Sequence, residues 1–241
     1  MVGTQDPAQH HRGRSARRPL HEDIQDVLVE MGLRSGDAVP SESELIGLLG
    51  VSRGTLREAL KQLDALGIIE TKHGTGMFIA SFSLSPLVNG LVFHGKIADD
   101  DGAVEQAANL AEVRELLERQ LIRRVAVDID DAGLDRLRTR LEAMRSGPRD
   151  SLQLDEADLA FHTALYQDLG NTLVTDLVLA FWRVLRLLRP RLADHFDRHA
   201  GFVDKHEAIL LALQAHDPDA AEAAMASHFE GTRAWLEAAR A

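Results

Sequence analysis

The chain has 241 residues, a formal net charge of −11 and no cysteine. This length allows one small and one larger domain, while the lack of cysteine excludes disulfides and thiolate zinc sites and is typical of a reducing cytoplasm. The acidic balance argues against general affinity for nucleic acid, so any DNA-binding charge must be local. No apolar run approaches the length of a membrane span and no signal-peptide core is present, so we expect a cytoplasmic protein with no membrane contact.

Residues 1–20 contain a cluster of basic side chains, Arg12, Arg14, Arg17 and Arg18, among glycine, serine, proline and histidine. This composition predicts a disordered basic tail. Its arginines could attract DNA or enter a minor groove. We favour the alternative, a solvated tail without a role in binding.

Two short helices with a tight connection are predicted between residues 41 and 66. Ser41 followed by Glu44 is a capping box, which begins the first helix. Gly50 ends that helix, and Ser52 caps the second. Helices joined this closely must cross, as in the supersecondary unit whose second helix enters the major groove of DNA.

The second of these helices has two different faces. Apolar side chains form one stripe, and basic side chains recur every four residues on the other face, at Arg53, Arg57 and Lys61. The planar fork of arginine matches both phosphate and the guanine edge, so we expect the arginines to read bases and Lys61 to contact the DNA backbone. Ser52 and Thr55 are further candidate contacts. The alternative is an ordinary solvated helix face.

A β-hairpin is predicted after the second helix. The β-prone segments 68–71 and 77–80 flank a glycine-bearing turn that carries His73 and Gly74, both candidate DNA contacts. Together with the helices, this hairpin predicts a winged helix-turn-helix over residues 21–80. A histidine in such a turn can also be simply exposed.

The remainder of the chain is predicted to be helical. Periodicity fades between residues 81 and 105, which we assign to a linker with a short helix around 86–93. From residue 106 to 241 apolar residues recur with helical spacing, and no strand pattern interrupts them. The predicted fold class is therefore mainly α, a winged helix-turn-helix with a small β wing followed by an all-α antiparallel helical bundle.

The predicted bundle contains four candidate metal ligands in apolar surroundings. Asp158 and His162 are four residues apart and share one helix face, whereas His206 and His228 lie on the last two helices. Antiparallel helices could bring all four to one point, where imidazole and carboxylate suit zinc, nickel or manganese and leave positions open to a small molecule. Each histidine taken alone is more often a core or surface residue.

Other conspicuous residues of the bundle have simpler interpretations. His195 and His199 are also four apart, but they lie in a polar stretch and are expected to be exposed near a loop. Trp182 and Trp235 recur within apolar helical stripes, which favours a role as core anchors.

Three spaced motifs resemble the amino-terminal winged helix of the GntR family of bacterial transcription regulators. They are Pro-Ser-Glu-x-x-Leu at Pro40–Leu45, Val-Ser-Arg-x-x-x-Arg-Glu-Ala-Leu at Val51–Leu60, and a Gly-x-Gly turn at Gly74–Gly76. The expected role of His73 rests mainly on this resemblance. Relatives usually carry arginine where this chain has Ser43, which puts a DNA contact at that position in question.

The region from Ala107 to Trp235 resembles the helical FCD effector domain of the FadR-type branch of that family. In many members, an Asp-x-x-x-His pair and two later histidines hold a divalent metal that helps to bind a small organic acid. The resemblance assigns these roles to Asp158, His162, His206 and His228. Zinc is the metal most expected, with nickel and manganese as alternatives.

The segment 112–118 resembles the opening of the same domain, where an arginine often points inward at the carboxylate of the effector. Arg114 is therefore the candidate effector-binding residue. A surface ion pair with Glu115 or Glu118 is the alternative.

These resemblances imply a ligand-responsive regulator, expected to be a repressor, that reads a palindromic operator in double-stranded DNA as a homodimer. Its effector would be a small organic acid such as a sugar acid, hydroxy acid or dicarboxylate. No catalytic residue is predicted. Two alternatives stay open: a metal-dependent enzyme with Glu207 or Asp155 as general base, and a metal-stabilised dimerisation module without an effector.

Overall fold

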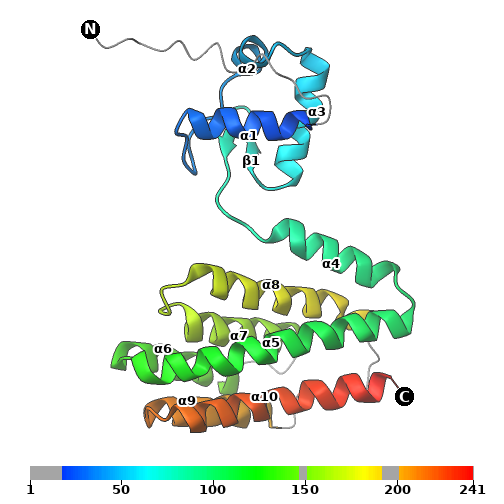
Figure 1. Ribbon diagram of the computed structural model, residues 1–241. Helices are drawn as coiled ribbons and strands as arrows, with labels where there is room; N and C mark the ends of the chain where they lie inside the picture. Colours follow the sequence, from blue (N-terminus) through cyan, green and yellow to red (C-terminus); the bar gives the residue numbers. More distant parts are fainter. Residues whose placement is uncertain (1–17, 147–150, 192–200, 241) are drawn as a thin grey trace. The chain divides into compact units, whose positions relative to one another are not determined.

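The computed structural model describes residues 18–146, 151–191 and 201–240. Within these residues the chain forms ten α-helices, the short 3₁₀ helix η2 (Arg189–Arg191) and one two-stranded antiparallel sheet (Figure 1). It divides into two compact units, the first ending at Pro86 and the second beginning at Leu87. The predicted fold class, mainly α with a small β wing in the amino-terminal part, is confirmed. Among the described helices, none combines the length and apolar character that a membrane crossing requires.

The first unit packs three helices and a hairpin around one small core. Its elements are α1 (Leu20–Glu30), α2 (Glu42–Leu49), α3 (Arg53–Ala65), β1 (Ile69–Lys72) and β2 (Gly76–Ile79). Each helix and the first strand bury at least one aliphatic side chain completely or almost completely, among them Ile24, Leu45, Leu56, Leu63 and Ile69. This shared core positions the exposed face of α3.

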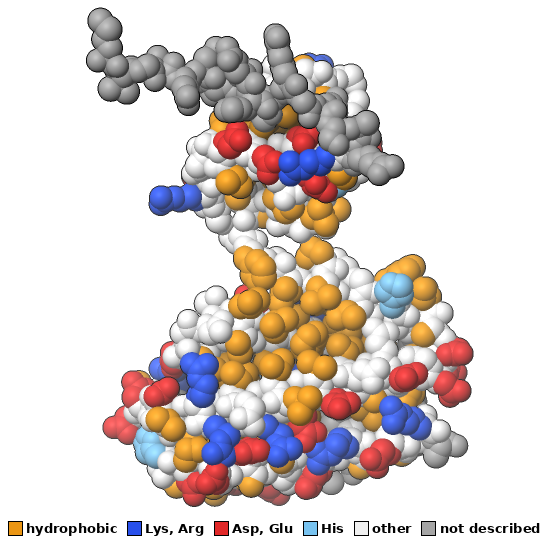
Figure 2. Space-filling view, viewed as in Figure 1, with side chains coloured by type: hydrophobic (Ala, Val, Ile, Leu, Met, Phe, Trp, Pro, Cys, Tyr) orange, Lys and Arg blue, Asp and Glu red, His pale blue; other side chains and the backbone are white. Residues whose placement is uncertain are grey.

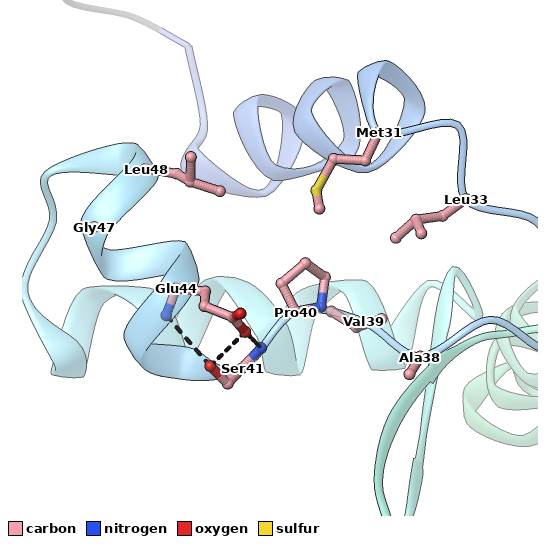
Figure 3. Close-up of a pocket in the computed structure, with 9 residues that line it drawn as sticks. All are labelled: Met31, Leu33, Ala38, Val39, Pro40, Ser41, Glu44, Gly47 and Leu48. Atoms are coloured by element: carbon pink, nitrogen blue, oxygen red, sulfur yellow. Dashed lines mark hydrogen bonds between the residues drawn. The ribbon is translucent and has the colours of Figure 1, made fainter. Parts of the chain in front are cut away.

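Local capping fixes the start of both helices of the helix-turn-helix. The backbone N–H of Ser41 donates to Glu44 Oε2 at 2.8 Å, and the backbone N–H of Glu44 donates to Ser41 Oγ at 3.3 Å, so the predicted capping box is confirmed (Figure 3). Ser52 Oγ accepts from the backbone N–H of Thr55 at the start of α3. Between the helices, Gly50 adopts a left-handed conformation with φ of 65°, which lets the chain turn sharply.

The wing is a short hairpin with a tight turn. Its register pairs Ile69 with Ile79 and Lys72 with Gly76. Gly74 in the turn has φ of 75°, a value that favours glycine. The hairpin agrees with the predicted wing and presents the side chain of His73 to solvent.

The second unit is a helical bundle around one long central helix. Its helices are α4 (Ser85–Ile97), α5 (Asp100–Asp128), α6 (Asp131–Ser146), α7 (Ser151–Tyr166), α8 (Thr172–Leu188), α9 (Phe202–Gln214) and α10 (Pro218–Ala239). α5 packs against α7, α8, α9 and α10 (Figure 1). Apolar side chains of α5, α6, α7, α9 and α10 form its main core, including the buried aromatic rings of Phe161, Tyr166 and Phe229.

Most of the segment 81–105, which the sequence assigns to a linker, is helical. α4 occupies its centre, and the first turns of α5 occupy its end. α4 buries Val88 and Val92, and a Cβ at Gly95 would lie only 2.6 Å from a methyl carbon of Leu188. The end of α4 thus lies close to α8 at Gly95, while the glycines and short polar residues of this helix give it a weak periodic pattern.

We predict opposite effects on stability for alanine at two neighbouring glycines. Gly50→Ala should destabilise the first unit by about 1–2 kcal/mol, because alanine is strained at positive φ. Gly47→Ala should stabilise it by about 0.5–1 kcal/mol, because this glycine lies inside α2 with open space around it. Hydrogen exchange of the α2 and α3 amides is the suitable measurement, since both tryptophans lie in the second unit. Equal shifts in the two variants would contradict the role assigned to the left-handed turn.

Candidate DNA-binding surface and metal site

The recognition helix α3 presents its basic residues to solvent. The side chains of Arg53, Arg57 and Lys61 are 67%, 57% and 73% exposed, respectively. The opposite face of the helix buries Leu56 and Leu63 in the core of the first unit. The structure therefore places the three predicted DNA-binding side chains on one accessible face.

Two further candidate contacts lie at the start of the same helix. The hydroxyls of Ser52 and Thr55 are 2.8 Å apart, and both residues are exposed. Backbone N–H groups at a helix start attract anions such as phosphate. This position agrees with the contacts that the sequence predicts for both residues.

A carboxylate that the sequence did not single out holds the two arginines. Glu42, in the first turn of α2, accepts from Arg57 Nε at 2.8 and 3.1 Å through its two oxygens, and Arg53 Nε lies 3.8 Å from it. The hydrogen bond from Arg57 lowers the pKa of Glu42. Because this contact crosses the turn between two helices, helical periodicity alone could not reveal it.

The wing tip and position 43 are less strongly basic. His73 and Gly74 are exposed at the turn, where Lys72 pairs with Glu70 at 2.8 Å. The Ser43 hydroxyl lies 3.0 Å from the hydroxyl of Ser41. A DNA contact at position 43 therefore stays a question that the sequence raised.

The four predicted metal ligands lie together inside the second unit. Asp158 and His162 come from α7, His206 from α9 and His228 from α10, and one ligand atom of each lies within 4.8 Å of all the others. His206 Nε2 is 3.0 Å from Asp158 Oδ1, and His162 Nε2 is 3.3 Å from His228 Nε2. Ligand atoms around a tetrahedral zinc are about 3.3 Å apart. The donor set and these separations fit a divalent metal.

Contacts on the far side of two imidazole rings orient them toward this centre. His206 Nδ1 donates to the backbone carbonyl of Phe202 at 2.7 Å, and His162 Nδ1 lies 2.7 Å from Glu118 Oε2. Trp182 Nε1 donates to Asp158 Oδ2 at 2.8 Å, so this buried tryptophan also orients a candidate ligand. Metal-binding histidines usually have such partners on the nitrogen that does not bind the metal.

Arg114 points into the bundle instead of lying on the surface. It is 7% exposed, and its Nε and Nη2 contact Glu118 Oε1 at 2.9 and 2.7 Å. Its guanidinium also lies 5.4 Å from the ring centroid of Phe229. An ion pair with Glu118, which the sequence suggested only as a surface alternative, is thus present but buried beside the candidate metal site.

The buried ionisable groups at this site shift one another's pKa values, some upward and some downward. Burial alone would raise the pKa of Glu118, but the charges of Arg114 and His162 lower it to about 2. Burial would lower the pKa of His162, but the charge of Glu118 and the hydrogen bond with Asp158 raise it to about 9. Burial and the neighbouring histidines hold the pKa of His228 well below its usual range. One proton is therefore stably held where a metal cation would bind.

Both residues considered as catalytic bases are engaged in ion pairs. Asp155 is buried and pairs with Arg189, whose pKa is lowered by burial. Glu207 pairs with Arg145 at 2.5 Å. Sequence reasoning did not identify Arg189, because it follows the last regular turn of α8 and no helical spacing relates it to Asp155.

Some residues that the sequence singled out have no structural description or a different environment. Arg12, Arg14, Arg17, His195 and His199 lie outside the described residues. Arg18, the remaining arginine of the basic cluster, pairs with Glu22 and Asp26 of α1.

A winged helix with a basic exposed face is joined in one chain to a helical unit with a buried cluster of aspartate and histidines. This combination is typical of a DNA-binding transcription regulator. Comparison with family models matches residues 18–79 to the bacterial regulatory proteins of the gntR family and residues 109–231, about half of the chain, to the FCD domain. The chain belongs to the GntR family of bacterial regulators and carries an FCD domain. Since this family and the relatives described below are transcription regulators, the protein is not an enzyme.

Relatives match along nearly the whole chain. The HTH-type transcriptional repressor NanR of Citrobacter rodentium is 28% identical over 225 residues, which cover 91% of this chain and 86% of that protein. NanR of Escherichia coli K12 is 27% identical, with 91% and 85% covered. Among solved structures, a GntR protein of Streptococcus agalactiae matches with a TM-score of 0.64 and 25% identity, covering 89% of this chain and 97% of that one.

Arg57→Ala should weaken binding to a duplex that the wild-type protein selects from random sequences, by about 1–3 kcal/mol, and should relax the choice of base at one position. Lys61→Ala is the matched comparison. It should weaken binding to all duplexes by the same factor and reduce the slope of log affinity against log salt concentration by about one. Fluorescence anisotropy at several salt concentrations measures both effects, and an Arg57→Ala protein with unchanged affinity and specificity would remove this side chain from the interface.

His206→Ala should lower the bound zinc after dialysis, because it removes one of the buried nitrogen donors of the cluster. His94→Ala is the control, since this exposed histidine lies on α4 outside the cluster. Plasma emission of both variants and the wild type gives the metal stoichiometry. Full zinc occupancy and unchanged affinity in the His206 variant would exclude that residue as a ligand.

Proposed function

We propose that the protein is a ligand-responsive transcriptional repressor whose helical unit binds a divalent metal, with zinc favoured, together with a small organic acid. The observation that carries this proposal is the meeting of Asp158, His162, His206 and His228 inside the bundle. Nickel and manganese are alternatives for the same ligands. The function as a repressor is supported by the relatives named as transcriptional repressors.

The metal and nearby arginines are the groups proposed to bind the effector. One carboxylate and three imidazoles would fill a tetrahedral site, so an oxygen of a small acid would enter as a fifth or sixth ligand or replace one imidazole. The contacts of Arg114 with Glu118 use Nε and Nη2, which leaves Nη1 for the carboxylate of the acid. Arg189, which is paired with Asp155, is a second cation of the bundle; burial lowers its pKa, and the charge of Asp158 opposes that shift. This chemistry favours sugar acids, hydroxy acids and dicarboxylates.

The DNA-bound form is proposed to be a homodimer. In Figure 2, apolar side chains form a continuous area over α8 and the adjoining edge of α5. Both helices expose large apolar residues, namely Val113, Leu116, Leu173 and Leu187. Contiguous exposed apolar areas mark protein interfaces. Two-fold pairing would let two α3 helices read a palindromic operator. Because bacterial chromosomal DNA lies in the cytoplasm, the protein is proposed to act there.

Effector binding is proposed to change the affinity for the operator. Such coupling between two sites is typically about 1–3 kcal/mol and is reciprocal, so operator DNA must change the affinity for the acid by the same factor. The remaining alternative is a helical unit in which the metal has a purely structural role.

A screen of organic acids tests the proposed function. Zinc-loaded protein should melt at higher temperature with one class of acid, and the gain should disappear after chelation, because the acid needs the metal as a ligand. The same acid should change the affinity for the selected duplex about 5–150-fold. Stabilisation by zinc with no response to any acid would favour the structural module. Acid binding that survives complete removal of metal would contradict the shared site.

A further inference from the structure

We propose that Glu118, which the sequence motifs assign to no site, is a positioning residue for the metal ligand His162. The proposal rests on the proposed metal site, and it concerns how this chain presents one ligand to the metal. Glu118 lies on the central helix α5, whereas all four candidate ligands lie on α7, α9 and α10.

The two oxygens of Glu118 have separate partners. Oε1 contacts Arg114 Nη2 at 2.7 Å, and Oε2 contacts both His162 Nδ1 at 2.7 Å and the hydroxyl of Tyr166 at 2.9 Å. The side chain of Glu118 is completely buried. A carboxylate with three polar partners and no access to water has little freedom to rotate, so its position is set by the fold.

This arrangement decides which nitrogen of His162 faces the metal. Glu118 Oε2 lies 2.7 Å from Nδ1, so a small rotation of the imidazole would let a proton on Nδ1 be donated to the carboxylate, and Nε2 lies 3.6 Å from Asp158 Oδ1 and 3.3 Å from His228 Nε2. A carboxylate on the distal nitrogen fixes the tautomer of a metal-bound imidazole and raises its basicity as a ligand. Glu118 therefore acts through His162 and does not itself need to reach the metal.

Arg114 has a defined part in the same arrangement. A buried carboxylate without a compensating cation would be costly, and Arg114 supplies that cation through Nε and Nη2. A buried ion pair that served only stability could be replaced by apolar residues with little loss. The contact of Oε2 with an imidazole of the cluster distinguishes the positioning role from such a purely structural pair.

The first test is the zinc affinity of Glu118→Gln, measured by competition with a chromophoric chelator. Loss of the carboxylate should weaken zinc about 10–100-fold, the usual effect of removing such a partner. Tyr166→Phe is the matched control, because it removes another hydrogen bond to the same oxygen but leaves His162 Nδ1 facing the carboxylate. Its zinc affinity should stay much closer to that of the wild type.

A second variant guards against misfolding, because Glu118→Gln leaves Arg114 buried without its anion. The double variant Arg114→Met with Glu118→Gln removes both charges, and its metal-free melting temperature measures whether the bundle still folds. A folded double variant should show the same loss of zinc affinity.

Nuclear magnetic resonance gives a measurement that does not depend on the stability of the bundle. The Nδ1 proton of His162 should be downfield and protected in the zinc-loaded wild type, and it should lose this shift in both variants.

The outcomes separate this inference from the proposed function. Wild-type affinity and an unchanged Nδ1 resonance in Glu118→Gln would overturn the positioning role while leaving the metal site intact. An equal loss in Tyr166→Phe and Glu118→Gln would assign the effect to packing and would also overturn it. A wild-type protein that binds no divalent metal would remove both proposals together.

Discussion

Among its described residues the second unit buries three carboxylates, and two of them, Glu118 and Asp158, meet at the histidine cluster. Glu118 and Asp158 are both almost completely inaccessible to water, and a buried charge is tolerated only when cations and hydrogen bonds surround it. Arg114, His162, Trp182 and the other histidines of the cluster supply these partners. Because those partners come from α5, α7, α8, α9 and α10, charge compensation sets the relative positions of most helices in the bundle.

The same constraint supports the proposal that a cation occupies the cluster. Without metal, the positive charge beside Asp158 depends on a proton held by His162, whose pKa is about 9. His228 is kept neutral, because burial and two neighbouring imidazoles disfavour a second proton. A divalent ion can satisfy Asp158 and both imidazoles at once, and it needs His162 as a neutral ligand. Metal binding therefore exchanges a proton for a cation without leaving either buried carboxylate uncompensated.

Features encoded by short sequence spacing could be predicted, whereas contacts between distant helices could not. The capping box at Ser41 and the break at Gly50 depend on neighbouring residues, and the face shared by Asp158 and His162 follows from one helical turn. Glu118 meets His162 only after α5 and α7 pack, and the pairing of Glu42 with Arg57 requires α2 and α3 to cross. The extent of helix in the segment 81–105 is likewise not predictable from spacing, since contacts such as that of Gly95 with Leu188 form only when α4 and α8 meet.

Two arginine–glutamate contacts, one in each unit, have opposite consequences for ligand exchange. Arg57 and Glu42 meet in solvent, where an ion pair typically contributes only about 0–1 kcal/mol, so a phosphate or a guanine can replace the glutamate at little cost. Arg114 and Glu118 meet inside the bundle, where removing one partner leaves the other charge buried without compensation and destabilises the fold. An acid entering the bundle therefore cannot displace Glu118 as DNA can displace Glu42. Under the proposed function, the acid would add to the existing arrangement through the metal and the remaining nitrogen of Arg114, and metal occupancy would then be a condition for effector binding.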